Sequence, residues 1–265
     1  MPEREIIDCH IHPGVDAAGA TSWFIGVGDP SEQIATLRRA GIHRACGAPI
    51  QVMQPDSFAP IRRLNDQALA LRDRFPEFYI PGIQVHPRFP EESCAEIERC
   101  CGGEGVRWIG ELVGYLMGFG EEYASRNAVK IFREAARFGA VINFHCASLD
   151  VIERACRAVP EAQFVLAHPG GGREEFLARI ALVARLSNLH LDISGSGIDR
   201  YGILHKAIDV AGKEKLLFGT DYPINNPAVY VQGALFERLS EEEYAALFHG
   251  NFRRLTGIAG EGSGG

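Results

Sequence analysis

Two histidines separated by one residue end the first apolar run of the chain, residues 6–12 (IIDCHIH). Side chains of a strand alternate between its two faces, so His10 and His12 would project from the same side, about 7 Å apart along the backbone. Two imidazoles at that spacing can bind one metal ion from a rigid support. Partly buried strand histidines without a ligand can show the same spacing, so the pair alone leaves both interpretations open.

Four other apolar runs end in the same kinds of side chain. The runs at 106–110, 141–144, 164–167 and 216–220 lead directly into Glu111, His145, His168 and Asp221. Imidazoles and carboxylates at the C-terminal ends of separate strands are what a metal site on a parallel barrel requires. Any one of them could be a buried core histidine or a helix-capping carboxylate. Together they favour a metal centre.

Strand-like and helix-like segments alternate eight times along the chain, and this alternation predicts how the candidate ligands are positioned. We expect strands at 5–12, 42–48, 78–85, 106–111, 140–145, 163–168, 188–194 and 215–221. Amphipathic helices are expected from Ser31 to Gly41, at about 57–74, 91–101, 126–138, 148–158, 173–186 and 199–211, and after Ser240. Eight such units predict a single (β/α)₈ TIM barrel over residues 1–259, followed by a flexible Gly-rich tail at 260–265.

Composition narrows the classes of function. The chain has 265 residues, 46% of them hydrophobic, and a net charge of −7, which disfavours nucleic acid as a partner. No apolar stretch approaches the roughly 20 residues that cross a membrane, and the N-terminus lacks the pattern of a signal peptide. A cytoplasmic protein is expected. The seven cysteines form no Cys-x-x-Cys pair, and we expect Cys9 and Cys146 to pack against helices.

Two stretches are expected to be loops on the catalytic face. Residues 13–30 are rich in glycine and contain Trp23 and Phe24, and residues 112–125 contain Tyr115. Both follow strand ends, which favours substrate lids, although ordinary surface loops with packed aromatic residues would have the same composition.

The motifs resemble those of the amidohydrolase superfamily, in particular its amidohydrolase-related branch, which includes zinc decarboxylases of the aminocarboxymuconate-semialdehyde type. The similar segments are DCHIH at 8–12, NFH at 143–145, AHPGG at 167–171, LHLDISG at 189–195, FGTDYP at 218–223 and GNFRRL at 250–255. They span nearly the whole chain in the expected order. Two other segments, IGE at 109–111 and QVHP at 84–87, resemble TatD-type metal-dependent hydrolases, in which the strand-four glutamate bridges two metal ions.

The resemblance implies a divalent ion, most simply zinc, held by His10, His12 and Asp221, with His145 completing or extending the site. Manganese or another first-row ion also fits these ligands. If Glu111 and His168 bind metal as well, the chain holds two ions rather than one. If they do not, His168 becomes a general acid/base or an oxyanion stabiliser. Asp221 would take a proton from the metal-activated water.

Other residues are candidates for contact with a small-molecule substrate. His86 and Arg88 could orient a substrate carboxylate or face solvent, and Tyr222 and Asn225 would line the pocket. The function that the resemblance implies is hydrolysis of an amide, lactone or ester-like bond. The alternative is a metal-dependent decarboxylase or hydratase of an unsaturated carboxylic acid, in which Arg88 or a partner subunit's arginine would hold the departing carboxylate. A homo-oligomer is compatible with either reading.

Overall fold

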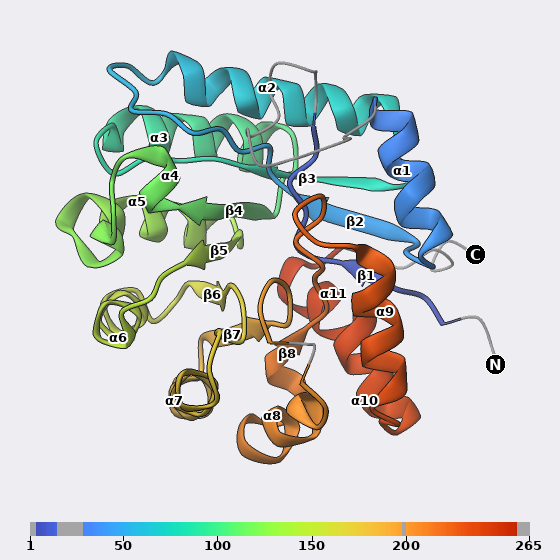
Figure 1. The fold of residues 1–265 in the computed structure, drawn as a ribbon. Coiled ribbons are helices and arrows are strands. Elements are labelled where there is room, and N and C mark those ends of the chain that lie inside the picture. Colours follow the sequence, from blue (N-terminus) through green and yellow to red (C-terminus); the bar gives the residue numbers. More distant parts are fainter. Residues whose placement is uncertain (1–3, 15–28, 198–199, 259–265) are drawn as a thin grey trace.

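Eight parallel strands follow one another around a single sheet in chain order. The computed structural model describes residues 4–14, 29–197 and 200–258. Each strand pairs with the next, from β1 to β8 (Figure 1). The strands are β1 (Ile7–Asp8), β2 (Arg44–Gly47), β3 (Tyr79–Ile83), β4 (Trp108–Val113), β5 (Val141–His145), β6 (Gln163–Leu166), β7 (Leu189–Asp192) and β8 (Leu216–Leu217).

Backbone hydrogen bonds between the segments that follow β8 and β1 close the sheet into a barrel. The Cys9 N–H donates to the Phe218 carbonyl at 2.8 Å, and the Asp221 N–H donates to the His10 carbonyl at 2.8 Å. Ile11 and Tyr222 form a parallel bridge beside them. All eight predicted strands are present, and the predicted single TIM barrel is confirmed.

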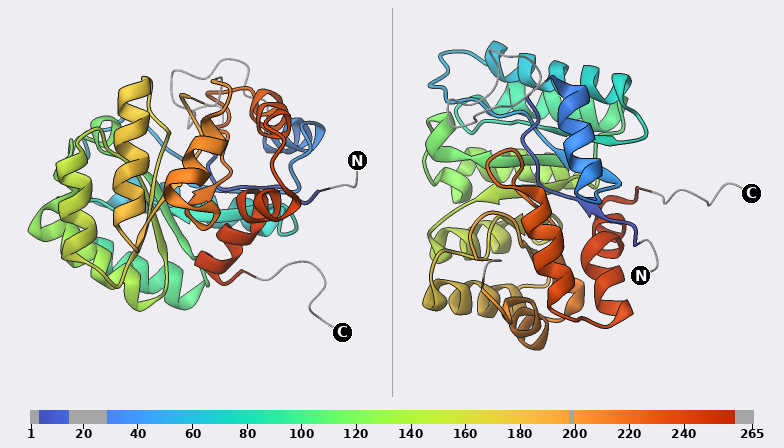
Figure 2. Two further views of the ribbon diagram at one scale, coloured as in Figure 1. Left: turned by 90° about the horizontal axis from the view of Figure 1, so that it is seen from below. Right: turned by 45° about the vertical axis from the view of Figure 1, so that its right-hand side comes forward.

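Helices follow the strands, and most of them cover the outside of the barrel (Figure 2). They are α1 (Pro30–Arg39), α2 (Ala59–Arg74), α3 (Pro90–Ile97), α4 (Gly114–Met117), α5 (Arg126–Arg137), α6 (Leu149–Ala158), α7 (Arg173–Arg185), α8 (Ile203–Ala211), α9 (Pro227–Phe236), α10 (Glu241–Ala245) and α11 (Asn251–Thr256). Side-chain caps mark several starts: Ser125, Ser148 and Ser240 each accept a hydrogen bond from an amide in the first turn.

Two expectations about the connections need correction. The stretch 112–125 is not simply a loop, because it holds the end of β4, the short helix α4 and a 3₁₀ turn at Glu122–Ala124. The helix α9 was not predicted. The other expected loop, 13–30, lies mostly outside the described residues, as does the tail at 260–265.

The core has two apolar layers, one between the strands and the helices and one inside the barrel. Inside, Trp108 of β4 meets Phe252 of α11 with ring centroids 5.4 Å apart, so the last helix packs against the barrel interior. Cys146 belongs to the outer layer, as expected. Cys9 does not, because it packs with Ile7 in the inner cluster.

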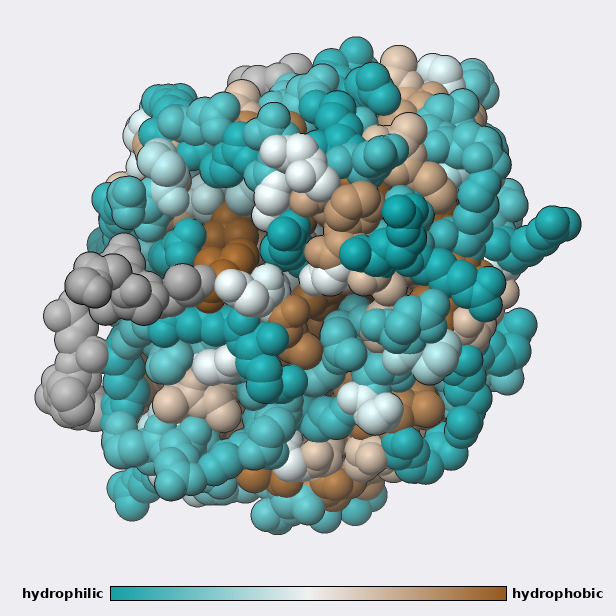
Figure 3. Space-filling model, turned by 180° about the vertical axis from the view of Figure 1, so that it is seen from behind, coloured by the Kyte–Doolittle hydropathy of each residue, from teal (hydrophilic) through white to brown (hydrophobic). Residues whose placement is uncertain are grey.

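Among the described residues, no helix is long and apolar enough to cross a bilayer. The face seen in Figure 3 is mostly hydrophilic, with apolar side chains in scattered patches.

His190 on β7 should make the stability of the barrel depend on pH. Its ring is buried, Nδ1 lies 3.3 Å from the Phe164 carbonyl, and burial together with the charge of Lys215 lowers the pKa of His190 to about 3. The unfolded chain takes up a proton near pH 6.5 whereas the folded chain does not, so stability falls as the pH drops below that value. As the pH falls from about 7.5 to about 5, this histidine should lower the free energy of unfolding by roughly 2 kcal/mol.

The measurement is urea unfolding at both pH values for the wild type and for His190→Gln, which keeps a donor for Phe164. We expect the variant to show a smaller loss of stability at the lower pH. An equal loss in both proteins would mean that His190 is not the responsible group.

Candidate metal centre

A break in the first strand turns His10 and His12 toward the centre of the barrel. The Cys9 N–H bonds to Phe218 beyond β8, whereas the Ile11 N–H bonds to Cys46 of β2 at 3.1 Å. In an unbroken strand these two amides would point to the same neighbour. Ile7 and Cys9 both face inward, as alternation requires, and the break falls between Cys9 and His10, whose carbonyl accepts from Asp221 on the same side as the Cys9 amide. His10 and His12 nevertheless converge, and their Nε2 atoms lie 3.3 Å apart.

A bulge in β4 directs Glu111 to the same place. The pairing of β4 with β5 shifts register between Ile109 and Leu112, so two residues of β4 face one residue of β5. The bulge needs glycine at position 110, where φ is +96° and a Cβ would lie 2.1 Å from the Asn143 carbonyl oxygen. The local sequence Gly-Glu thus fixes the direction of the carboxylate.

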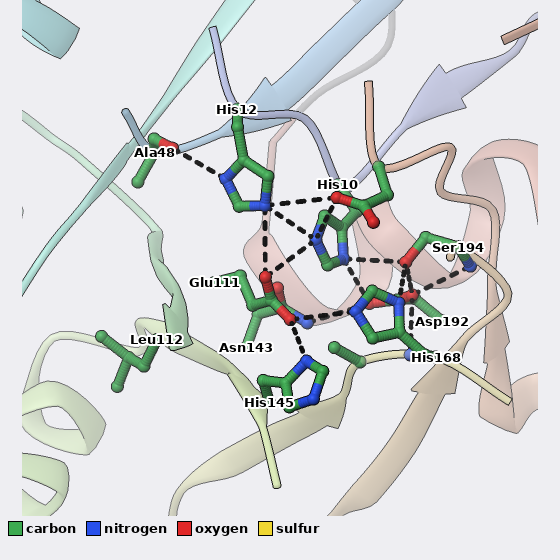
Figure 4. Close-up of polar contacts among 12 residues, drawn as sticks. His10, His12, Ala48, Glu111, Leu112, Asn143, His145, His168, Asp192 and Ser194 are labelled. Carbon is green, nitrogen blue, oxygen red and sulfur yellow. Dashed lines mark hydrogen bonds and ion pairs between the residues drawn. The ribbon is translucent and has the colours of Figure 1, made fainter. Parts of the chain in front are cut away.

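The Glu111 carboxylate lies between two pairs of histidines (Figure 4). Its Oε2 atom is 3.3 Å from His10 Nε2 and 3.2 Å from His12 Nε2. Its Oε1 atom is 3.2 Å from both His145 Nδ1 and His168 Nε2. The structure therefore brings together all six residues that the sequence analysis assigned to metal binding, with Asp221 completing the first group.

Hydrogen bonds at the outer ring nitrogens orient three of the histidines. Nδ1 of His10 donates to Asp192 at 2.9 Å, and Nδ1 of His12 to the Ala48 carbonyl at 3.2 Å. Nδ1 of His168 donates to the Ser194 hydroxyl at 3.0 Å. A neutral imidazole that donates from Nδ1 carries its lone pair on Nε2, so each lone pair points into the centre.

This convergence of electron pairs fits a divalent ion. Asp221 Oδ1 is buried without a hydrogen-bond partner among the described residues, 3.4 Å from His12 Nε2 and 3.7 Å from His10 Nε2. Lone pairs this close repel unless they share a cation. Ligands about 2.0–2.1 Å from a tetrahedral ion lie roughly 3.3 Å from one another, which matches the spacing of this group.

The metal-free site would hold protons instead. Burial opposes a positive charge on His12, but the carboxylates of Asp221 and Glu111 raise its pKa to about 9. Burial would likewise raise the pKa of Asp192, but the neighbouring His10 lowers it to about 2. A metal ion must displace the protons on these imidazoles, so its affinity should increase with pH.

Two of the candidate ligands have strained backbones. His168 and Asp221 adopt left-handed conformations, with φ of 69° and 62°. Such conformations are unfavourable for residues other than glycine and persist where the surrounding structure enforces them, often at functional sites.

A cavity of about 290 Å³ opens over the centre. Polar and ligand side chains form part of its lining, and the rest is apolar. The lining residues are His12, Ile50, Glu111, Val113, Tyr115, Leu116, His145, His168, Gly195, Ser196, Asp221, Ile224 and Asn225. Asn225 is therefore at the site as predicted, and its amide group donates to Asp221 Oδ2 at 3.3 Å.

Three residues predicted to contact substrate do not line this cavity. His86 is buried and its Nε2 bonds to the Met117 carbonyl at 2.8 Å, while Arg88 bonds to the Pro55 carbonyl at 3.0 Å. Tyr222 lines a separate small space beside α1. Within this structure, His86 and Arg88 hold loops together.

Several residues that shape the centre are harder to find in the sequence. Asn143 donates to Asp192 at 3.0 Å, and its position two residues before His145 on β5 is a usable signal. Asp8 accepts hydrogen bonds from the Thr220 amide at 3.0 Å and the Thr220 hydroxyl at 2.5 Å. No local pattern identifies Ile50 or Ile224 as lining residues, because both lie in irregular connections.

Comparison with known proteins gives a family and a fold. The family model described as Amidohydrolase matches residues 7–258. No curated protein matches the chain. Similar solved structures include 5-carboxyvanillate decarboxylase from Sphingomonas paucimobilis, with a TM-score of 0.73 and 15% identity over 96% of this chain and 99% of that one.

Two further structures are similar at the same level. 2,6-Dihydroxybenzoate decarboxylase from Rhizobium has a TM-score of 0.72 and 15% identity, covering 97% of this chain and 100% of that one. Dihydroxybenzoic acid decarboxylase from Polaromonas sp. JS666, with bound manganese and 2-nitroresorcinol, has a TM-score of 0.75 and 15% identity, covering 96% and 97%. At these identities the likeness establishes the fold.

Proposed function

Since this chain belongs to the amidohydrolase family, we propose that it is a metal-dependent decarboxylase of a small aromatic or unsaturated carboxylic acid. The observation that carries the proposal is a cavity in which a cluster of metal-binding side chains adjoins an apolar wall that includes Ile50, Val113 and Leu116. The decarboxylases among the similar structures support it. This was the alternative, rather than the leading, expectation from the sequence.

His10, His12 and Asp221 would hold the ion, with Glu111, His145 and His168 beside them. A divalent ion, zinc or manganese, would supply a positive charge that binds and polarises the carboxylate end of the substrate. The apolar wall would keep water from the rest of the substrate, and a poorly hydrated carboxylate loses CO₂ more readily because its charge disperses as the bond breaks.

Asp221 is placed to handle the proton that the reaction consumes. In its protonated form it would give a proton to the carbon that bears the carboxylate. The C–C bond then breaks, its electron pair re-forms the double bond between that carbon and its neighbour, and CO₂ leaves. Solvent returns a proton to Asp221. Asn225, which donates to Oδ2, would keep Oδ1 directed into the centre.

The test is CO₂ release by metal-loaded protein from a panel of hydroxybenzoates and unsaturated acids. We expect at least one acid to yield CO₂ and the corresponding decarboxylated product in equal amounts, with loss of both after chelation. Failure of every acid, together with turnover of an ester, lactone or amide, would overturn the proposal.

Hydrolysis, the leading expectation from the sequence, stays the second candidate because of Glu111. Its two carboxylate oxygens contact two separate histidine pairs, an arrangement suited to two ions that activate water and bind a substrate oxygen. Reactions run in ¹⁸O-labelled water separate the two candidates. A hydrolysis product gains one labelled oxygen at the cleaved bond, whereas the decarboxylated product gains only a solvent proton.

A further inference from the structure

The apolar wall of the cavity is a fixed part of the fold. Ile50, Val113 and Leu116 are 4%, 1% and 6% exposed and form a cluster separate from the main core. They come from the segment after β2, the end of β4 and helix α4. A hydrogen bond of 2.9 Å from the Met53 amide to the Leu116 carbonyl joins the segment after β2 to α4. A ligand therefore meets a preformed apolar surface.

No lysine or arginine lines this cavity. Every lysine and arginine of the chain belongs to the described residues, because the remaining ranges, 1–3, 15–28, 198–199 and 259–265, contain neither type. Among the described residues, the polar side chains in the lining beyond the candidate ligands are those of Tyr115, Ser196 and Asn225. These groups can bond to a hydroxyl or carbonyl group, but they cannot neutralise a second negative charge.

The guanidinium groups of three arginines already donate hydrogen bonds to backbone carbonyls of neighbouring segments. Arg88 bonds to the Pro55 and Gly118 carbonyls. Arg179 bonds to the carbonyls of Ala167, His168 and Cys146 at 3.1–3.2 Å, and Arg200 to those of Gly170 and Gly171. Turning any of them into the cavity would leave carbonyl groups unpaired, which is costly where they are buried.

We infer that the substrate carries its only charged group at the metal centre and presents an uncharged, largely apolar body to the Ile50–Val113–Leu116 wall. A second carboxylate or a phosphate on that body would be desolvated without a counter-charge. The cavity of about 290 Å³ lies at the small end of the range for small-molecule sites, which suits a body of about one ring. The inference rests on the proposed function only in taking the charged group to be a carboxylate.

Calorimetric titration of the metal-loaded protein tests the inference without requiring turnover. The matched ligands are 2-hydroxy-5-methylbenzoate and the same ring with a second carboxylate in place of the methyl group. We expect the methyl compound to bind at least about tenfold more tightly. Equal or tighter binding of the dicarboxylate would overturn the inference, and so would failure of both compounds to bind at millimolar concentration.

A charge added to the lining should offset this preference. Ile224 lines the cavity and is 42% exposed, so Ile224→Lys places an ammonium group there with room to extend. We expect the variant to bind the dicarboxylate at least about tenfold more tightly than the wild type does. The control is Val229→Lys on α9, which is 55% exposed and does not line the cavity.

An equal gain in both variants would mean that overall charge decides the affinity, and the inference would fall. Tight binding of the methyl compound without release of CO₂ from any acid in the panel would leave this inference standing and would defeat the decarboxylase proposal. The two failures are therefore distinguishable.

Discussion

Asp221→Asn should lower turnover by at least about a hundredfold even when metal is in saturating excess. The amide keeps the size of the side chain and one oxygen donor, so metal binding should weaken only in part. It cannot give or take the catalytic proton, and general acid–base catalysis contributes about 10²- to 10⁴-fold. Initial rates with the preferred substrate, together with metal content from elemental analysis, provide the measurement.

The matched control is Asp209→Asn, the same chemical change at an exposed position of α8. It should turn over like the wild type. Near-normal turnover by metal-saturated Asp221→Asn would transfer the proton role to His168, whose Nε2 atom faces the same centre. If a His168→Gln variant were also active, proton transfer by either residue would be ruled out.

The double variant His10→Ala/His12→Ala should lose tight metal binding while keeping its fold. We expect the wild-type protein, purified without chelator, to carry between one and two divalent ions per chain. The two Nε2 atoms, 3.3 Å apart, supply two of the three donors in the group that Asp221 completes, and neither ring belongs to the apolar core clusters. Loss of both should weaken binding at least about a hundredfold, since losing even an outer partner of a ligand costs 10- to 100-fold.

Metal content, metal affinity and circular dichroism measure this effect. The control removes two histidines outside the centre, His205 and His249, and should retain the full metal content. Because the pKa of His12 is raised to about 9, the affinity of the wild type should fall as the pH is lowered from about 9 toward 6. A double variant with a full complement of metal would refute the assignment of these histidines.

The barrel could be predicted because its strands are apolar runs of ordinary length and its helices have amphipathic spacing. Helix α9 (Pro227–Phe236) escaped prediction because apolar residues occur all around it, so there is no stripe to detect, and Val229 and Phe236 remain exposed. The stretch 112–125 was misjudged because aromatic residues and glycines read as a loop, although Tyr115 lies in the one-turn helix α4.

The clustering of the candidate ligands could be predicted because barrel topology brings the C-terminal ends of all the strands to one face. The detailed geometry could not. His10 and His12 alternate with Ile11 as predicted, but a break between Cys9 and His10 is what turns both imidazoles toward the centre. Glu111 reaches both histidine pairs only because of the bulge at Gly110, and a register shift is a property of two paired strands. Arg88 donates hydrogen bonds to the carbonyls of Pro55 and Gly118, which are 33 and 30 positions away in the sequence, so no local pattern reveals these contacts.

The junction between β1 and β8 also determines when, during synthesis, the barrel can close. Asp8 and Thr220, which bond across that junction, are 212 residues apart in the sequence. A ribosome adding 5–20 residues per second needs roughly 10–40 s to cover that distance. His10 and His12 are therefore synthesised long before Asp221. The candidate ion site that these three residues would form is complete only once the final strand has joined the first. Uptake of an ion by the His10–His12–Asp221 group should accordingly follow closure of the ring.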